Sequence, residues 1–229
     1  MAATWLYAGT GLLILALFLA ERRWESAVTR LEENILATLL ALITIISFVQ
    51  VVMRYGFNTT FGGALELTRI IFAWLILFGM SYGVKMGSHL GVDAFIRMLP
   101  GKGLRYVAIF GAAATLLYAV MLISVDWMKI FGVTSKGGAV VYWSKMYQLQ
   151  LGLEDLKYPT WISEPLGLEE RVKRWMAYLI LPVGLGLLAF RSLQAMIQII
   201  RGERELIIAG HEAEDLVAEN KDVLKGEQA

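Results

Sequence analysis

Residues 35–52 read ILATLLALITIISFVQVV, a run without one charged side chain. Its apolar residues surround every side of a helix rather than forming a stripe at a spacing of 3.6 residues. A helix of this kind must face lipid or other apolar helices. A helix needs about 20 residues to cross a hydrocarbon core of about 30 Å. This stretch therefore predicts a membrane-spanning helix and an integral membrane protein.

The composition of the whole chain supports this prediction. Of its 229 residues, 57% are hydrophobic and 18% are charged, and the mean hydropathy is +0.59. A soluble domain usually has about 25% charged residues. The net charge of +1 gives no general attraction to nucleic acid, so we expect no nucleic-acid partner. The absence of cysteine excludes disulfides, thiolate metal sites and cysteine nucleophiles.

Three further apolar runs can cross a bilayer, at about residues 64–84, 106–125 and 175–200. We predict an all-α integral membrane protein with four core transmembrane helices, which form a membrane domain over residues 34–200. The second and fourth runs need their flanks to reach the required length. Glu66, Arg69 and Arg191 are therefore expected near the membrane interfaces.

A shorter apolar run occupies residues 5–20. It lacks the basic start and the A-x-A site of a cleaved signal peptide. We predict an extra N-terminal apolar helix over residues 1–20, which spans the membrane with its N-terminus outside. A helix that lies in the membrane interface is the alternative.

Residues 21–33 have an amphipathic pattern. Trp24, Val28 and Leu31 recur at helical spacing, and charged residues occupy the other face. This pattern predicts an interfacial helix with Trp24 at headgroup depth. A direct extension of the first core helix explains the same residues equally well.

The basic residues of the loops predict the orientation, because cytoplasmic loops carry an excess of Lys and Arg. The loop of residues 85–105 and the segment after the last helix are rich in them, and Arg191 is taken to follow that helix. We therefore expect this loop and the acidic tail 201–229 in the cytoplasm. The long loop 127–174 then lies outside, and its Gly and Pro residues predict several short elements rather than one helix.

Residues that carry chemistry are scarce. The chain has two histidines, too few inside the membrane for the paired axial ligands of a haem bundle. It has no HExxH motif, no Walker A loop and no nucleophile elbow. We expect no catalytic residue, no cofactor and no metal, and we predict that the chain is not an enzyme.

The centres of the predicted spans carry only weakly polar residues. A self-sufficient transporter buries charges or broken helices near the bilayer midplane. Pro182, Gly184 and Gly186 are the residues able to break the last helix. A kink and close helix packing are the more common role of such residues, and we prefer that interpretation.

Charged residues gather at the two ends of the second core helix. Arg54 and Tyr55 close the first helix, and Glu66 and Arg69 open the second at i, i+3 spacing. An ion pair between Arg54 and Glu66 would fix the hairpin. Contact of these residues with a partner subunit is the alternative.

Lys85, His89 and Asp93 lie at the other end of this helix, on one face if the helix continues. A metal would need a third ligand, so a contact with headgroups or another subunit is the preferred interpretation. Trp74 is expected to be a packing anchor, within this chain or between chains.

The sequence from residue 50 to residue 100 resembles the small membrane subunit (Q subunit, DctQ-like) of tripartite ATP-independent periplasmic (TRAP) transporters. The matching positions are Gln50, Val51, Arg54, Tyr55, Glu66, Arg69, Phe72, Trp74, Gly79, His89, Asp93, Leu99 and Pro100. Many members carry a Trp and a second acid just before the Glu, where this chain has Gly63 and Leu65. The stretch 61–69, FGGALELTR, is more similar to the C4-dicarboxylate branch.

The resemblance implies an accessory subunit in the bacterial inner membrane, surrounded by membrane lipids. In this family a large multispan subunit carries the substrate and sodium sites, and a periplasmic substrate-binding protein delivers the organic acid. The residues expected to fix the hairpin or to meet a partner are Arg54, Tyr55, Glu66, Arg69, Trp74, Lys85, His89 and Asp93. A small self-contained oligomeric transporter or channel and the membrane anchor of a redox enzyme are the alternatives.

Overall fold

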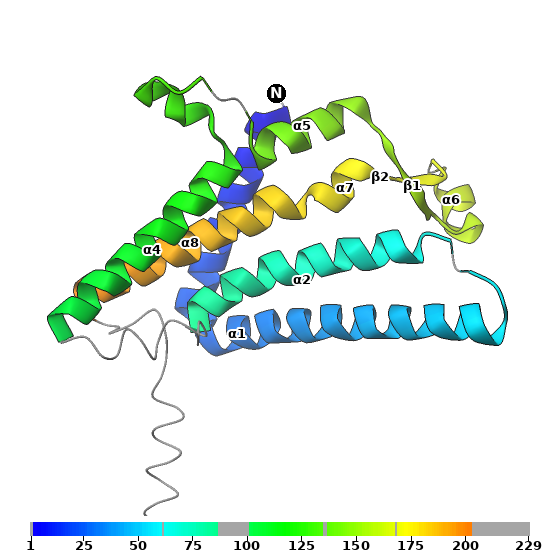
Figure 1. Cartoon of the computed structure of the whole chain (residues 1–229), viewed down its shortest axis with the longest axis horizontal. Coiled ribbons are helices and arrows are strands. Elements are labelled where there is room, and N and C mark those ends of the chain that lie inside the picture. The colour runs from blue at the N-terminus through cyan, green and yellow to red at the C-terminus, as the bar shows by residue number, and fades with distance from the viewer. Residues whose placement is uncertain (1, 61, 87–100, 135–136, 168, 203–229) are drawn as a thin grey trace, which may run out of the picture. The chain divides into compact units, whose positions relative to one another are not determined.

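The computed structural model describes residues 2–60, 62–86, 101–134, 137–167 and 169–202 (Figure 1). Within these ranges, four helical segments are long and apolar enough to cross a membrane. They are Ala3–Gly56, Ala64–Met86, Gly103–Ile123 and Arg174–Arg201. The predicted helical membrane fold with four core spans is confirmed. His89, Asp93 and the tail from residue 203 lie outside the described residues.

The chain divides into two compact units. Met1–Ser81 and Leu117–Phe190 form the first unit, and Tyr82–Leu116 and Arg191–Ala229 form the second. The first unit contains the start of the chain, the α1–α2 hairpin, the segment between α4 (Gly101–Ile123) and α8 (Ile180–Arg201), and the first half of α8.

Helix α1 (Ala2–Gly56) is broken once, at Trp24, whose φ of −142° and ψ of 58° are not helical. Two helices result, over residues 2–23 and 25–56. Residues 25–33 therefore continue directly into the first core span, with Val28 and Glu32 buried. Whether this extension lies in the membrane interface stays a prediction.

Helix α2 (Ala64–Met86) runs antiparallel to the second part of α1. The side chain of Gln50 donates a hydrogen bond to Thr68 Oγ1 at 3.5 Å. Towards the other end of α2, a Cβ added to Gly79 would lie 3.7 Å from the side chain of Leu36. A higher residue number in α1 is thus paired with a lower residue number in α2, as in a helical hairpin.

The last span begins with the short helix α7 (Arg174–Tyr178) and continues as α8 after Leu179. Pro182 lies in the first turn of α8, where a helix tolerates its missing N–H. A Cβ added to Gly184 would lie 2.7 Å from Leu77 Cβ, and one added to Gly186 would lie 2.9 Å from Thr10 Cγ2. These glycines therefore serve close helix packing, and the helix continues through them.

The segment between α4 and α7 consists of short elements. In order they are the 3₁₀ helix η1 (Asp126–Phe131), α5 (Ala139–Leu149), β1 (Gly152–Lys157), α6 (Thr160–Leu166) and β2 (Arg171–Lys173). The prediction of several elements is confirmed. The strands β1 and β2 pair antiparallel, with Gly152 opposite Lys173 and Lys157 opposite Arg171. This β-hairpin was not predicted, because its strands lack the apolar alternation of a half-buried strand.

A buried cluster joins the start of α1 to α5, which lie side by side in Figure 1. Leu6, Val140 and Trp143 form its centre, and Trp175 of α7 packs against it. The indole N–H of Trp143 donates a hydrogen bond to the carbonyl oxygen of Trp175 at 3.0 Å. The first turns of the chain are thus fixed beside the segment that precedes the last span.

The second unit contains the later half of α8, and one prediction about it is wrong. Arg191 does not follow the last helix, because α8 continues to Arg201, and its side chain is only 1% exposed. Its guanidinium donates to Gln194 Oε1 at 2.9 Å. In the last turn of α8, the carbonyl oxygen of Ile200 accepts a hydrogen bond from the side chain of Arg105 in α4. This contact satisfies one of the carbonyls that a helix leaves open at its C-terminus.

Candidate interaction site at the α1–α2 turn

The turn between α1 and α2 has two irregular points. After α1, the backbone N–H groups of Phe57 and Thr59 both donate to the carbonyl oxygen of Met53, at 3.3 and 3.0 Å. Asn58 between them has a φ of 50°. The chain then enters α2 through Gly63, whose φ of 79° is in the left-handed region that glycine tolerates.

Glu66 lies in the first turn of α2 and binds the backbone of β1. Its Oε2 accepts hydrogen bonds from the N–H of Asp155 at 3.0 Å and from the N–H of Leu156 at 2.9 Å. Hydrogen bonds to a charged carboxylate are among the stronger ones in proteins. The first turn of a helix also favours a negative charge. The carboxylate thus stabilises the start of α2 and holds β1 beside it.

Gly63 makes this close approach possible. A Cβ added there would lie 2.7 Å from the carbonyl oxygen of Asp155 and 2.9 Å from the Cα of Leu156. These are backbone atoms of β1, which cannot move aside as a flexible side chain can. The neighbouring Gly62 has nothing within 4 Å of an added Cβ. We call Gly63, Glu66, Asp155 and Leu156 the β1 latch.

The predicted ion pair between Arg54 and Glu66 is wrong. Both residues are described by the structure, and they form no ion pair with each other. Glu66 uses its carboxylate on the β1 backbone instead. The guanidinium carbon of Arg54 lies 5.8 Å from the centre of the Tyr55 ring, and both side chains are exposed. Arg69, one turn after Glu66, is exposed as well. Within the described ranges, neither arginine makes an ion pair.

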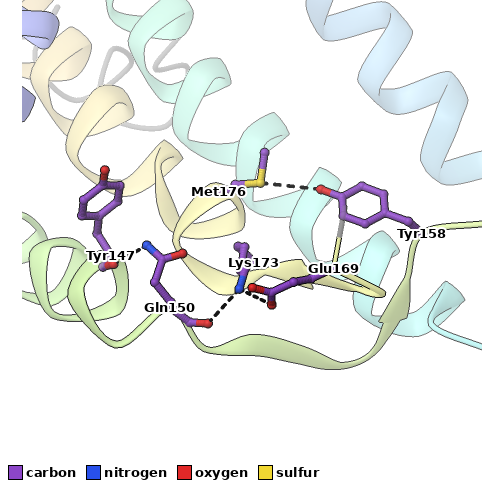
Figure 2. Close-up of polar contacts among 6 residues, drawn as sticks. All are labelled: Tyr147, Gln150, Tyr158, Glu169, Lys173 and Met176. Atoms are coloured by element: carbon purple, nitrogen blue, oxygen red, sulfur yellow. Dashed lines mark hydrogen bonds and ion pairs between the residues drawn. The ribbon is translucent and has the colours of Figure 1, made fainter. Parts of the chain in front are cut away.

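Polar contacts at both ends of the β-hairpin also connect it to α5 and α7 (Figure 2). The ammonium group of Lys173 donates to the carbonyl oxygen of Gln150 at 3.3 Å and forms an ion pair with Glu169. The Gln150 amide donates to the carbonyl oxygen of Tyr147 at 2.6 Å. The Tyr158 hydroxyl lies 3.7 Å from the sulfur of Met176 in α7. The hairpin is therefore held at both ends, by the β1 latch and by these contacts.

The exposed edge of the hairpin carries charged pairs. Lys157 and Glu170 lie 2.9 Å apart, and Arg174 and Glu154 lie 3.8 Å apart. The hydrogen bond from Lys157 and its positive charge hold the pKa of Glu170 below its usual value. Exposed pairs of this kind add little to stability. They instead give this edge a mixed charge.

The remaining predicted residues are placed less fully. Trp74 in α2 and Lys85 near the end of α2 are both half-buried. His89 and Asp93 lie outside the described ranges. The interface roles predicted for all four residues stay predictions. Among the residues that the structure describes, no group of three His, Cys, Asp or Glu side chains could hold a metal ion.

Gly63 and the backbone of β1 belong to this site, although neither was predicted from the sequence. One signal was present: Gly63 stands where many proteins of the resembled family carry a larger residue. A glycine at such a position indicates a left-handed backbone or a close approach of another backbone, and Gly63 has both. The β1 backbone is separated from Glu66 by 89 residues, so no local pattern identifies it.

Comparison with known proteins gives consistent results. Residues 43–202 match the model of the family described as tripartite ATP-independent periplasmic transporters, DctQ component. A relative from Vibrio cholerae serotype O1, the C4-dicarboxylate TRAP transporter small permease protein DctQ, is 33% identical, covering 88% of this chain and 87% of the relative. A protein of the same name from Pseudomonas aeruginosa is 28% identical, covering 81% and 90%. Another from Rhodobacter capsulatus is 28% identical, covering 72% and 74%.

Proposed function

The chain belongs to the DctQ component family of the tripartite ATP-independent periplasmic transporters, and from this premise we propose that it is the small accessory subunit of a C4-dicarboxylate importer. The observation that carries the proposal is the match over residues 43–202, which includes three of the four candidate spans completely and the last part of the first, residues 43–56. Small permease subunits work with a large permease and a substrate-binding protein in the bacterial inner membrane. C4-dicarboxylates are named for three relatives of this chain.

The buried polar residues support an accessory role. Among the described residues, the buried polar or charged side chains are Glu32, Ser81, Arg191 and Ser192. A site for a dicarboxylate needs several cationic or hydrogen-bonding groups that converge on two carboxylates. Arg191 is the single buried cation within the described ranges, and its guanidinium contacts Gln194. We therefore assign substrate and sodium binding to the large subunit.

We further propose that the large subunit covers the second part of α1. None of residues 35–52 is buried within this chain, whereas half of the apolar window of the last span is buried. Phe48 is 67% exposed and Tyr55 is 79% exposed, at the end of the helix that carries Arg54. Exposed aromatic residues and arginines are frequent anchors of protein interfaces. Arg54, Tyr55 and Arg69 are the residues that we expect to contact the partner.

The binding protein is expected to meet the side of the chain that carries the β-hairpin, and the C-terminus is expected in the cytoplasm. Alkaline phosphatase tests this orientation, since the enzyme is active only outside the cytoplasm. A fusion after residue 144 should be active, and one after residue 88 should be inactive. The opposite pattern would refute the orientation without affecting the family assignment.

Purification from the native host tests the accessory role. The tagged chain, extracted in mild detergent, should bring down a multispan membrane protein in near-equal amount. Vesicles that contain both proteins, the binding protein and a sodium gradient should take up succinate, and vesicles with this chain alone should not. Uptake by this chain alone would refute the proposal in favour of a self-contained transporter.

A further inference from the structure

We propose that residues 2–23 form a fifth membrane-spanning helix, which runs in the same direction as α8 and begins on the membrane side of the segment 124–173. The family match starts at residue 43, so this helix lies outside it. The inference does not depend on the proposed function, because it rests on contacts within the first unit of the chain.

The start of this helix is fixed by α5. Leu6 is only 7% exposed and packs with Val140 and Trp143. Helix α5 belongs to the segment that joins the spans α4 and α8, so this segment lies at one membrane face. The first turns of the chain are therefore at that same face.

The middle of the helix follows α8. An added Cβ at Gly186 would lie 2.9 Å from Thr10 Cγ2 and 3.7 Å from Ile14 Cδ1. Further along, the rings of Phe18 and Phe190 meet edge to face, with their centres 6.2 Å apart. A higher residue number in the first helix is thus paired with a higher residue number in α8. The two helices therefore run in the same direction.

One face of the helix is covered along its whole length. Between residues 3 and 20, the less exposed residues are Ala3, Leu6, Thr10, Ile14, Leu17 and Ala20. Their spacing of three or four residues forms a stripe, which extends over about 26 Å at 1.5 Å per residue. The other faces carry large apolar residues such as Trp5, Leu12 and Leu19, exposed by 77%, 66% and 56%. A helix with this distribution suits packing on one side and lipid on the others.

The end of the helix is fixed by the path of the chain after Trp24. Residues 25–56 run antiparallel to α2, and α2 begins beside β1, so this part of α1 returns to the face that carries α5 and β1. Leu36 lies opposite Gly79, deep in α2. Trp24 precedes Leu36 by about 18 Å of helix, so it lies near the opposite face.

The first helix must therefore connect the two membrane faces. Its length of about 33 Å matches a hydrocarbon core of about 30 Å. The span also covers the Gly186 side of α8, where residues 184–188 are all buried. A large partner subunit consequently cannot bind at this side of α8.

Labelling of single cysteines tests the crossing, and the chain has no cysteine of its own. Thr4→Cys, Arg22→Cys and Lys145→Cys are introduced one at a time into the full chain, which is expressed with its partner proteins. A membrane-impermeant maleimide is applied to spheroplasts and to inverted vesicles. We expect residues 4 and 145 to be labelled from one side and residue 22 from the other. Labelling of residues 4 and 22 from the same side would refute the span.

Cross-linking tests the direction. The double variant Phe18→Cys with Phe190→Cys should be linked efficiently by a short bis-maleimide. The matched control, Leu6→Cys with Phe190→Cys, keeps the position in α8 and changes the end of the first helix. We expect at least about tenfold less product from the control. Equal products, or more from the control, would refute parallel packing whether or not the chain assembles into a transporter.

Discussion

Replacing Gly63 by alanine should release β1 from the start of α2. The added methyl group would lie 2.7 Å from the carbonyl oxygen of Asp155, and the residue would still have to adopt a φ of 79°. Neither problem has a local solution, because the neighbours are backbone atoms and the φ value is set by the entry into α2. The variant therefore relieves the contact by moving β1 away, which lengthens the hydrogen bonds to Glu66.

The size of this effect follows from two contributions. A left-handed conformation costs an alanine about 1–2 kcal/mol. A hydrogen bond to a charged group contributes about 1.5–3 kcal/mol. Because the variant either keeps the strain or gives up these bonds, we expect opening of β1 to become easier by about 2 kcal/mol. This corresponds to an increase of about 30-fold in the population of the open form.

Hydrogen exchange measures this opening directly. The amides of Asp155 and Leu156 are the donors to Glu66, and they exchange only when β1 leaves the carboxylate. In nanodiscs, both amides should exchange about 30-fold faster in the Gly63→Ala variant. Gly62→Ala is the matched control, because its added methyl group has nothing within 4 Å. If the two variants exchanged within a factor of two of each other, the β1 latch as described would be wrong.

Two further substitutions test separate parts of the chain. Gly184→Ala should push Leu77 away from α8 at a cost of about 1–3 kcal/mol, lowering the melting temperature by several degrees, whereas Gly79→Ala should leave it nearly unchanged. An unchanged melting temperature for Gly184→Ala would contradict the close packing. The pKa of Glu170 is lowered from its ordinary value of 4.5, so its pair with Lys157 stabilises the β-hairpin at pH values above 4.5. This stabilisation is lost as the pH falls through the lowered pKa. Glu170→Gln should therefore match the parent protein near pH 3 and melt slightly lower at pH 7, and a larger difference at pH 3 would reverse the assigned sign.

The membrane spans could be predicted from sequence because each one is determined locally. An uninterrupted apolar run of sufficient length has no stable place in water, whatever the rest of the chain does. The roles of Gly184 and Gly186 could also be predicted, since small residues in a span usually mark a close neighbour. The identity of the neighbours, Leu77 and Thr10, was beyond reach because both lie far away in the sequence.

Arg191 shows why a charge is an unreliable marker of a helix end. An arginine is a frequent residue of cytoplasmic flanks, so Arg191 was counted with the basic residues that follow the last span, although the apolar run continues to about residue 200. In the structure the side chain is buried and contacts Gln194, one turn further along the same helix. A buried arginine with a hydrogen-bond partner on the same helix does not terminate a span. The apolar residues that follow it, up to Ile200, continue the helix.

The role of Glu66 could be predicted only in part. Its position at the start of α2 indicated a residue that fixes the α1–α2 hairpin, and Arg54, on the other side of the short turn, was the predicted partner. The structure instead provides two backbone N–H groups from a strand that follows 89 residues later. An exposed arginine keeps its solvation without a partner, whereas the N–H groups of an edge strand lack partners unless something accepts their hydrogen bonds. Hydrogen bonds from the β1 backbone to the Glu66 carboxylate therefore contribute more stability than an ion pair with Arg54 would.

Two roles of Glu66 can now be distinguished: it fixes the α1–α2 hairpin through β1, or it also contacts a partner subunit. If Glu66 acts only through the β1 latch, Glu66→Ala and Gly63→Ala remove the same interaction, and their combination should lower succinate uptake no further than the stronger single variant. If Glu66 also contacts the large subunit, Glu66→Ala removes this contact in addition to the latch, so this variant alone should lower uptake clearly further than Gly63→Ala does. Membrane insertion, measured by the amount of protein in the membrane fraction, should be unchanged throughout. Arg69→Ala provides the comparison: as an exposed residue expected at the partner interface, it should add its effect to Gly63→Ala in full.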